Sequence, residues 1–213
     1  MEKTELRIKH PLYVKYVKRL IDIVLSLMAI LVLSPVLLVI VILELIYHGQ
    51  PVLYAQDRPG LNGEIFKLYK FRSMNNKKDA QGNLLPGKDR VTKFGRILRR
   101  LSLDELPELF CILTGKMSII GPRPLLVEYL PYYTERHQKR HMVKPGLAIV
   151  SHKPIKTWTW NDQFENDLWY VENVSLLVDI KMVFAVAKEA LVGSDYRVND
   201  TRDKITADYW KDA

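Results

Sequence analysis

An uncharged apolar run near the N-terminus constrains this chain more than any other feature of its sequence. Between Asp22 and Glu44 lie 21 residues without a charge, and the apolar segment around them extends from Leu20 to Tyr47. This length matches the roughly 20 residues that a helix needs to cross the hydrocarbon core of a bilayer. No small-residue cleavage site follows, so the run is not typical of a signal peptide. We therefore expect residues 1–47 to attach the protein to a membrane.

Ser34 and Pro35 stand in the middle of this apolar run. Pro35 cannot donate a hydrogen bond to the carbonyl of Leu31, and its ring crowds that turn, so a helix must bend there. The Ser34 hydroxyl can bond back to the carbonyl of Ile30 or Leu31, which would satisfy the freed acceptor in lipid. The pair therefore predicts a bend at which the Ser34 hydroxyl replaces the hydrogen bond that Pro35 cannot make. An ordinary spanning helix with a mild kink is the alternative.

Basic residues flank the apolar run on both sides. Residues 1–19 contain six Lys or Arg, and residues 48–100 contain twelve Lys or Arg against four acidic residues. Basic flanks favour the cytoplasmic side of a membrane, and a straight span can place only one of the two flanks there. A helix that enters the membrane, turns at Ser34-Pro35 and leaves on the same side satisfies both, with arms of about 20 Å each. The sequence favours this re-entrant, monotopic arrangement over a full span.

The rest of the chain predicts a helix-rich α+β body. We expect one domain, 48–192, on the cytoplasmic side, followed by a C-terminal tail, 193–213. Two stretches of strand character, 51–56 and 64–71, flank the turn DRPGLNG and predict a small β-hairpin. The polar loop 75–90 is long enough to form a lid or an active-site flap.

Apolar residues at helical spacing predict three helices in this body, over 91–101, 106–113 and 175–193. Cys111, the only cysteine, lies in the apolar stretch LFCIL and is expected to be a core residue. A single cysteine excludes an internal disulfide and a multi-cysteine zinc site, which fits a reducing compartment.

The chain carries a formal net charge of +8 and a pI near 9.4. This charge indicates an anionic partner, either nucleic acid, a phosphorylated substrate or an anionic lipid surface. No recognised nucleic-acid motif accompanies it, and the basic residues are spread among acids. The run RHQKRHMVKPG, which contains His137 and His141, is interpreted as a solvated or headgroup-facing charge run, because no metal-binding pattern accompanies its histidines.

Asp104 and Glu105 stand side by side in SLDELPELF, directly after a basic helix. Adjacent residues on a helix point about 100° apart, so the two carboxylates would not share one proton. They could still hold a magnesium ion and perform separate tasks. The alternative is purely structural, because Ser102 and Glu105 have the spacing of a capping box at a helix N-terminus.

Arg123 lies between two prolines in GPRP. Prolines on both sides stiffen the backbone, and an arginine on a stiff mount suits bidentate recognition of phosphate. The alternative is a rigid turn with a solvated arginine. Lys70 and Arg72 add two cations at the end of the second predicted strand.

In these motifs the sequence resembles the small monotopic phosphoglycosyl transferases, the bacterial sugar transferase family. The matching pieces, in order, are Ser34-Pro35, QDRPGLNGEIFKLYKFRSM, LRRLSLDELPELF, LTGKMSIIGPRPLLVEYLP and KPGL. The resemblance extends from about residue 12 to residue 192. It implies transfer of a phosphosugar from a UDP-sugar to a polyprenol phosphate such as undecaprenyl phosphate, with release of UMP.

The resemblance also implies where in the cell the reaction occurs and which residues take part in it. The reaction would be the first membrane step of a bacterial glycan, at the cytoplasmic face of the inner membrane. Asp104 would be the nucleophile of a covalent aspartyl–phosphosugar intermediate, assisted by Mg2+, and Glu105 would handle metal and proton. Arg123, Arg99 and Lys70 match family positions suited to gripping the phosphates.

The sequence departs from the family pattern after KPGL. The family run there is close to TGWAQVNGRN, whereas this chain has AIVSHKPIKTWTW. Lys156 is the candidate replacement for the arginine of that run, and we expect the segment 148–159 to influence which sugar nucleotide is accepted. The departure keeps an inactive scaffold of glycan assembly as an alternative, with a membrane-tethered nucleic-acid binder as a weaker one. A homo-oligomer is left open.

Overall fold

The computed structural model describes residues 6–152, 157–192 and 199–200 of the chain. The helices are η1 (Tyr13–Val17, a π-helical turn), α1 (Lys18–Tyr47), η2 (Leu61–Gly63), α2 (Gly87–Arg90), α3 (Lys93–Arg100), η3 (Leu103–Glu105), α4 (Glu108–Leu113), η4 (Val127–Tyr132), α5 (Glu135–Gln138), η5 (Lys139–Met142), α6 (Trp160–Asn173) and α7 (Leu176–Val192). The strands are β1 (Leu53–Pro59), β2 (Ile65–Phe71), β3 (Ser118–Ile120), β4 (Gly146–Ala148), β5 (Thr157–Trp158) and β6 (Asn199–Asp200).

The strands form small separate sheets among these helices. β1 and β2 make an antiparallel hairpin in which Leu53 lies opposite Phe71 and Pro59 opposite Ile65. β3 pairs with β4 in parallel, as does β5 with β6. The structure confirms the predicted helix-rich α+β body with an apolar N-terminal helix and a small hairpin.

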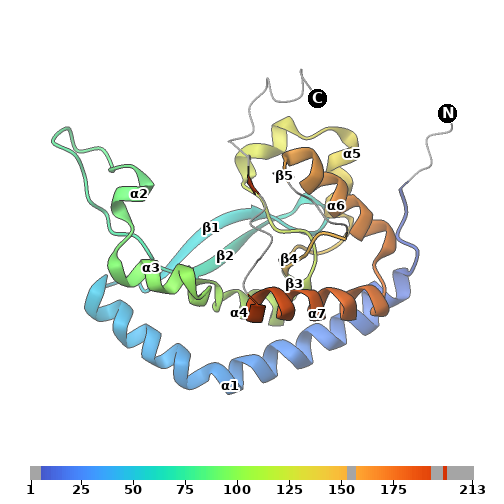
Figure 1. Ribbon diagram of the computed structural model, residues 1–213, viewed down its shortest axis with the longest axis horizontal. Helices are drawn as coiled ribbons and strands as arrows, with labels where there is room; N and C mark the ends of the chain where they lie inside the picture. Colours follow the sequence, from blue (N-terminus) through green and yellow to red (C-terminus); the bar gives the residue numbers. More distant parts are fainter. Residues whose placement is uncertain (1–5, 153–156, 193–198, 201–213) are drawn as a thin grey trace.

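Helix α1 is bent, and both of its ends turn toward the body of the protein (Figure 1). Pro35 lies inside this helix. The Ser34 hydroxyl donates to the carbonyl oxygen of Leu31 at 2.8 Å, one of the two acceptors predicted from the sequence. The predicted local repair at the proline is therefore confirmed.

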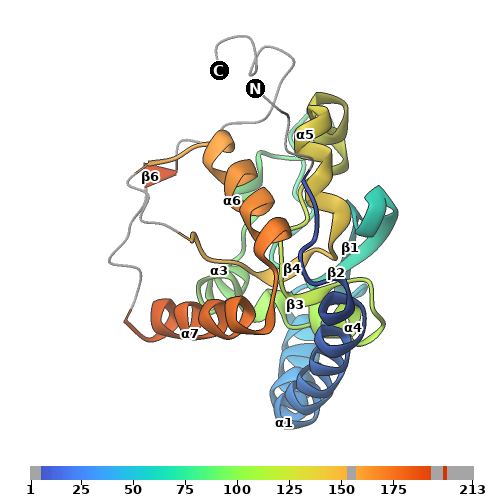
Figure 2. The ribbon, with the colours of Figure 1, turned by 90° about the vertical axis from the view of Figure 1, so that its right-hand side faces the viewer.

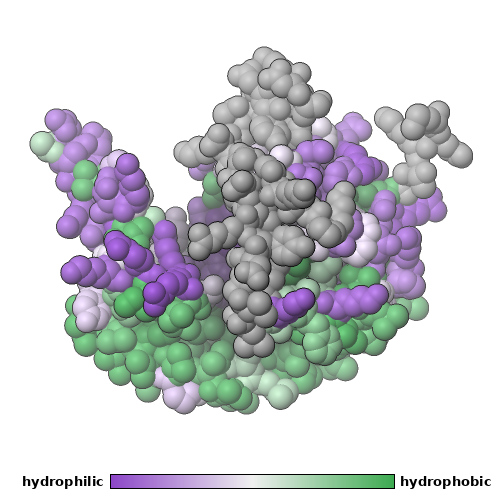
Figure 3. Space-filling model, in the orientation of Figure 1, coloured by the Kyte–Doolittle hydropathy of each residue, from purple (hydrophilic) through white to green (hydrophobic). Residues whose placement is uncertain are grey.

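The outer face of α1 is apolar and exposed. Leu20, Leu31, Val32, Leu38 and Ile46 each expose more than 60% of their surface. Figure 3 shows the resulting apolar band along the side of the molecule that α1 covers, with hydrophilic residues gathered above it. By length and composition α1 could cross a membrane.

Three shorter helices of the body add exposed apolar residues to the same side. They are α3, α4 and α7, which lie next to α1 in the two ribbon views (Figures 1 and 2). Their exposed side chains are Ile97 and Leu101 from α3 and the residue after it, Phe110 from α4, and Leu177, Val183 and Phe184 from α7. The apolar surface is thus wider than a single helix.

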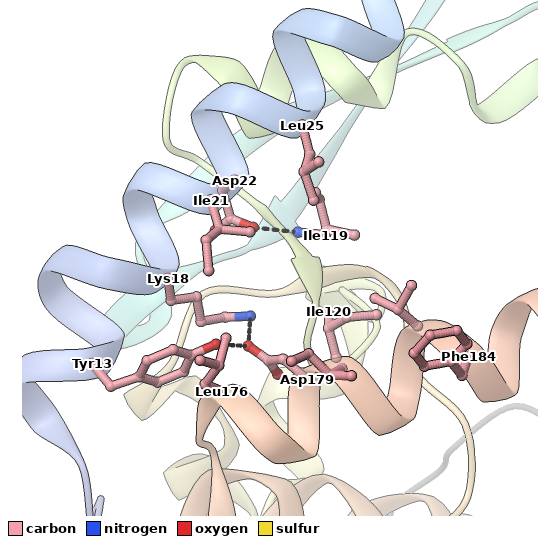
Figure 4. Close-up of a pocket in the computed structure, with 12 residues that line it drawn as sticks. Tyr13, Lys18, Ile21, Asp22, Leu25, Ile119, Ile120, Leu176, Asp179 and Phe184 are labelled. Carbon is pink, nitrogen blue, oxygen red and sulfur yellow. Dashed lines mark hydrogen bonds and ion pairs between the residues drawn. The ribbon is translucent and has the colours of Figure 1, made fainter.

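Buried polar contacts fix the N-terminal arm of α1 to the body (Figure 4). The Lys18 ammonium donates to the Asp179 carboxylate on α7 at 2.6 Å, and the Tyr13 hydroxyl donates to the same oxygen at 2.6 Å. One turn further, the Asp22 carboxylate accepts from the backbone N–H of Ile119 and the hydroxyl of Ser118, both at 3.0 Å. These contacts hold the arm against β3 and α7.

A second set of buried contacts fixes the C-terminal arm. Glu44 is fully buried and its carboxylate lies 2.8 Å from Nδ1 of His48, whose Nε2 lies 2.9 Å from the hydroxyl of Thr92. Thr92 is the N-cap of α3, where its hydroxyl accepts from the N–H of Gly95 at 2.9 Å. The end of the apolar helix is therefore connected to the start of α3.

A buried ion pair lies at the centre of the polar part of the body. Arg140 is 2% exposed and donates from Nε and an Nη to one oxygen of the Asp167 carboxylate, at 2.9 and 2.6 Å. His137, in the same basic run, is also buried and stacks on Phe164 with ring centroids 4.3 Å apart. The interpretation of this run as solvated is therefore wrong at these positions. Cys111 is buried, as predicted.

Asp167→Asn should destabilise the protein strongly, because it leaves the buried Arg140 charge without its counterion. Removing one partner of a buried pair costs about 3 kcal/mol or more, which corresponds to a Tm lowered by about 6–12 °C in a chain of this length. Glu165→Gln is the control, because Glu165 pairs with the exposed Arg136 and such pairs contribute less than about 1 kcal/mol. Thermal unfolding in detergent measures both, and equal losses would contradict the prediction.

Candidate active site

Asp104 and Glu105 lie in η3, a single 3-10 turn between α3 and α4. Ser102, directly before this turn, has a left-handed backbone with φ of 54°, which is costly for a residue with a side chain. Its hydroxyl makes no capping hydrogen bond, and only its backbone carbonyl accepts from the N–H of Glu105, at 3.3 Å. The capping-box alternative is therefore wrong, and the chain bends sharply where the two carboxylates stand.

Glu105 is held by two cations from different parts of the chain. Its Oε1 accepts from the Lys70 ammonium of β2 at 2.6 Å and from the Arg123 guanidinium at 2.5 Å. Burial by itself would raise the pKa of the Glu105 carboxyl, but Arg123 and Lys70 outweigh it and hold the pKa below its usual value. Glu105 is thus a paired anion that fixes both cations in place.

Asp104 has a different environment although it is the adjacent residue. Burial raises the pKa of its carboxyl, the negative charge of Glu105 raises it further, and Lys70 opposes the change. Within the described ranges, no cation lies close enough to form an ion pair with Asp104. The two neighbouring carboxylates are therefore unequal, one paired and one available.

The two carboxylates line a cavity of about 760 Å³. Its other charged lining residues are all basic, namely Arg58, Lys70, Arg72, Arg90 and Arg99. Such a volume can hold a nucleotide-sized ligand, and the cations can offset the charge of phosphate groups.

Most of the residues expected from the sequence meet at this cavity. Lys70, Arg72 and Arg99 line it with the two carboxylates, and Arg123 reaches it through its bond to Glu105. Arg99 donates from Nε to the hydroxyl of Ser73 at 2.7 Å, which orients its guanidinium. Lys156 lies outside the described residues.

Arg72 also makes hydrogen bonds with the backbone that could not be predicted from the sequence. Its guanidinium donates to the carbonyl oxygens of His48 and Pro51, at 3.2 and 3.1 Å. The Arg72 guanidinium therefore connects the hairpin to the segment that follows α1.

Two cations of this cavity, Arg58 and Arg90, were not predicted from the sequence. Arg58 donates to the carbonyl oxygen of Pro124 at 2.9 Å, so it also supports the turn that carries Arg123. The Nε of Arg90 is buried, and it has no hydrogen-bond partner among the residues that the structure describes. The available signal for Arg58 was its place in QDRPG, inside one of the motifs that carried the resemblance.

The backbone of Arg123 is fixed from behind. Arg140 donates from an Nη to the carbonyl oxygen of Arg123 at 2.8 Å. The preceding Gly121 approaches Gly146 so closely that a Cβ on Gly146 would lie 2.1 Å from the Gly121 nitrogen. The motifs GPRP and KPGL are thus in direct contact, and any side chain at position 146 would separate them.

Comparisons with known proteins agree with the motifs. A family model described as Bacterial sugar transferase matches residues 13–193. The relatives include a Bacillus subtilis protein named Uncharacterized sugar transferase EpsL, which is 43% identical over 82% of this chain and 87% of its own length.

Two longer relatives carry names that state a reaction. One is the UDP-N-acetylgalactosamine-undecaprenyl-phosphate N-acetylgalactosaminephosphotransferase of Aeromonas hydrophila, 33% identical over 86% of this chain and 45% of its own length. Another is the UDP-glucose:undecaprenyl-phosphate glucose-1-phosphate transferase of Escherichia coli, 38% identical over 84% of this chain and 41% of its own length. The chain spans less than half the length of these two relatives.

Asp104→Asn should raise the Tm at pH 7. A carboxyl whose pKa is raised in the folded state lowers the free energy of unfolding at every pH well above its unfolded value of about 3.9. The gain from removing this charge should therefore shrink toward zero as the pH falls to about 4.

Glu105→Gln is the matched comparison and should change the Tm in the opposite direction. Because the pKa of Glu105 is lowered on folding, its charge stabilises the protein above the unfolded value of about 4.3, and this contribution disappears as the pH falls through the folded pKa. Thermal unfolding from pH 4 to 7.5 measures both variants. A lower Tm for both at pH 7 would contradict the unequal roles.

Proposed function

Because the chain belongs to the bacterial sugar transferase family, we propose that it transfers a phosphosugar from a UDP-sugar to undecaprenyl phosphate, with release of UMP. The observation that carries this proposal is the unequal carboxylate pair inside a basic cavity. Phosphoryl transfer depends mainly on positioning and on cations that offset the phosphate charge. The named activities of the longer relatives support the same reaction.

In the proposed first step, a carboxylate oxygen of Asp104 attacks the sugar-proximal phosphorus of the UDP-sugar. The new Asp104 oxygen–phosphorus bond forms while the phosphorus–oxygen bond to UMP breaks, and the electron pair leaves with UMP. A carboxylate needs no base at neutral pH, and the raised pKa of Asp104 makes it more basic than an ordinary aspartate. Glu105, paired with Lys70 and Arg123, holds those two cations beside the reacting carboxylate.

In the second step, a phosphate oxygen of undecaprenyl phosphate attacks the same phosphorus and Asp104 leaves. The new bond from the lipid oxygen to phosphorus forms while the Asp104 oxygen–phosphorus bond breaks, and its electron pair returns to Asp104 as a free carboxylate. The phosphosugar becomes part of the lipid diphosphate product, and no proton has to be abstracted. Lys70, Arg90 and Arg99 line the same cavity and would offset the phosphate charges in both steps. One cavity thus serves a water-soluble donor and a lipid acceptor in turn.

A magnesium ion is part of the proposal. Mg2+ is usually held by one or two carboxylates together with waters and substrate phosphates, so it does not need an all-protein cage. The available Asp104 carboxylate fits this arrangement, and Glu105, the adjacent residue, would be the second carboxylate. The part of the chain that the structure describes holds no group of three or more His, Cys, Asp or Glu placed for a metal. When bound, the ion would reduce the repulsion between the carboxylates and the diphosphate.

We also propose that α1 is re-entrant and that the body lies on the cytoplasmic face of the inner membrane. Two observations support this: both arms of α1 pack on the same body through buried polar contacts, and its outer face is apolar and exposed. A full span would have to pull one arm away from its buried partners. Such polar groups are costly to leave unpaired in hydrocarbon.

The two-step reaction predicts an exchange without lipid. Given the correct UDP-sugar and labelled UMP but no undecaprenyl phosphate, the wild-type protein should incorporate label into the UDP-sugar. Asp104→Asn should reduce this exchange by about a thousandfold or more, because the amide is a poor nucleophile. Glu128→Gln, an exposed carboxylate outside the cavity, is the control and should exchange normally. Turnover with lipid but no exchange without it would indicate direct attack by the lipid phosphate.

The re-entrant helix predicts the same accessibility for both of its flanks. In a Cys111→Ser background, single cysteines at Lys9 and Lys78, both exposed, should resist an impermeant thiol reagent in intact cells and react after permeabilisation. Pro35→Ala should straighten α1, so that in a fraction of molecules the Lys9 site becomes labelled in intact cells. If only one of the two sites is labelled in intact cells while Pro35 is retained, the helix spans the membrane.

A further inference from the structure

A second cavity lies at the start of α1, and it shares no lining residue with the cavity of the carboxylate pair. Its volume is about 370 Å³. The lining comes from the first turns of the helix, from the β1–β2 turn and from the segment before β4, which contributes Lys144. The charged residues in this lining are Lys15, Lys18, Arg19, Asp22 and Lys144.

Arg19 and Lys144 bring two positive charges together in this cavity. The Arg19 guanidinium donates to the carbonyl oxygens of Ile112 and Leu113, at 2.7 and 2.8 Å, which fixes it at the end of α4. A Cβ on Gly115 would lie 3.3 Å from Cζ of Arg19 and 3.5 Å from Nζ of Lys144, so both cations gather around this glycine. Burial lowers the pKa of Lys144, and Arg19 lowers it further. The site therefore concentrates positive charge.

Asp22, the one acidic residue in the lining of this cavity, and Lys18 already have hydrogen-bond partners. Asp22 accepts from Ser118 and Ile119, and Lys18 is paired with Asp179. Within the described ranges, none of Lys15, Arg19 and Lys144 forms an ion pair with a carboxylate. These three cations outnumber the single carboxylate of the lining, Asp22, and the excess of positive charge favours an anionic ligand.

The position of these cations indicates where the anion would come from. Arg19 directly precedes Leu20, which is 63% exposed, and Val24 one turn later is 45% exposed. The cations therefore stand where the apolar helix begins, which is the height of lipid headgroups if α1 is embedded. Basic pockets beside membrane helices bind anionic lipid headgroups.

We propose that this cavity binds the phosphate headgroup of an anionic glycerophospholipid from the surrounding membrane. Lys15 and Lys144 would contact the phosphate from two sides, and Arg19 would support them with its fixed guanidinium. The proposal rests on the membrane placement of α1 but not on the transfer reaction. A lipid held here would fix the N-terminal arm at the bilayer surface without occupying the cavity of Asp104.

The test titrates dioleoylphosphatidylglycerol into the full-length protein in neutral detergent and follows the Tm. A ligand that binds the folded state raises the Tm saturably. Dioleoylphosphatidylcholine and inorganic phosphate should each leave the Tm unchanged. Each cation near an anionic lipid contributes a factor of about five in affinity, so Lys15→Gln with Lys144→Gln should weaken the apparent affinity about 25-fold. Added salt should also weaken the binding.

The matched control replaces Lys77 and Lys78, two exposed lysines in the loop between β2 and α2, with glutamine. It removes the same charge and should keep the wild-type affinity. The Tm of each variant without lipid reports whether it folds. The proposal would be overturned if both double variants bind alike, which would show only the attraction of a charged micelle. An equal shift from inorganic phosphate, or a shift from undecaprenyl phosphate alone, would also overturn it.

Discussion

The apolar helix α1 is joined to the body by buried polar contacts at both of its ends. Lys18 and Asp22 bind the N-terminal arm to α7 and β3, and Glu44 binds the C-terminal arm through His48 to the cap of α3. Between them, the bend of α1, the helix that contains Pro35, lets one continuous helix reach both anchors. Separating either arm would leave these buried polar groups without their partners, so the position of the whole body relative to the apolar surface depends on these contacts.

The candidate site also depends on how its buried charged side chains are paired. Glu105 is paired with Lys70 and Arg123, and Lys70 also binds Glu108, whereas Asp104 forms no ion pair within the part of the chain that the structure describes. Neighbouring carboxyl groups whose pKa values are driven apart are typical of sites where two acids have different tasks. The Arg140–Asp167 pair extends this arrangement inward, because Arg140 also binds the backbone that carries Arg123.

Local features of this fold could be predicted from the sequence, whereas the choice of distant partners could not. The hairpin, the helix 176–192 and the hydroxyl bond of Ser34 depend on neighbours within a few residues. Arg140 and Asp167 are 27 residues apart, and nothing in a basic run shows which of its members turns inward. For the same reason the sequence did not show that Arg72 also donates to the carbonyl oxygens of His48 and Pro51.

The candidate site was predictable in part for a related reason. Asp104 and Glu105 are adjacent, and Arg123 lies between prolines, so their chemistry is visible in short stretches of sequence. The left-handed Ser102 looked like a capping residue because spacing alone cannot show the sign of φ. Arg58 and Arg90 join the cavity only through the tertiary fold, which brings the hairpin, the loop after it and η3 to one place.

One buried apolar cluster connects this cavity to α1. Phe71 lines the cavity, and it also packs in one buried cluster with Ile40 of α1 and Leu98 of α3. The outer face of α1 next to this cluster carries the exposed Leu38 and Val39. Under the proposed reaction, the lipid phosphate would approach Asp104 from the side of α1, while the donor would enter from the hydrophilic side. Under this proposal the bent helix would do more than attach the enzyme, because it would set the height at which a soluble and a lipid substrate use the same carboxylate.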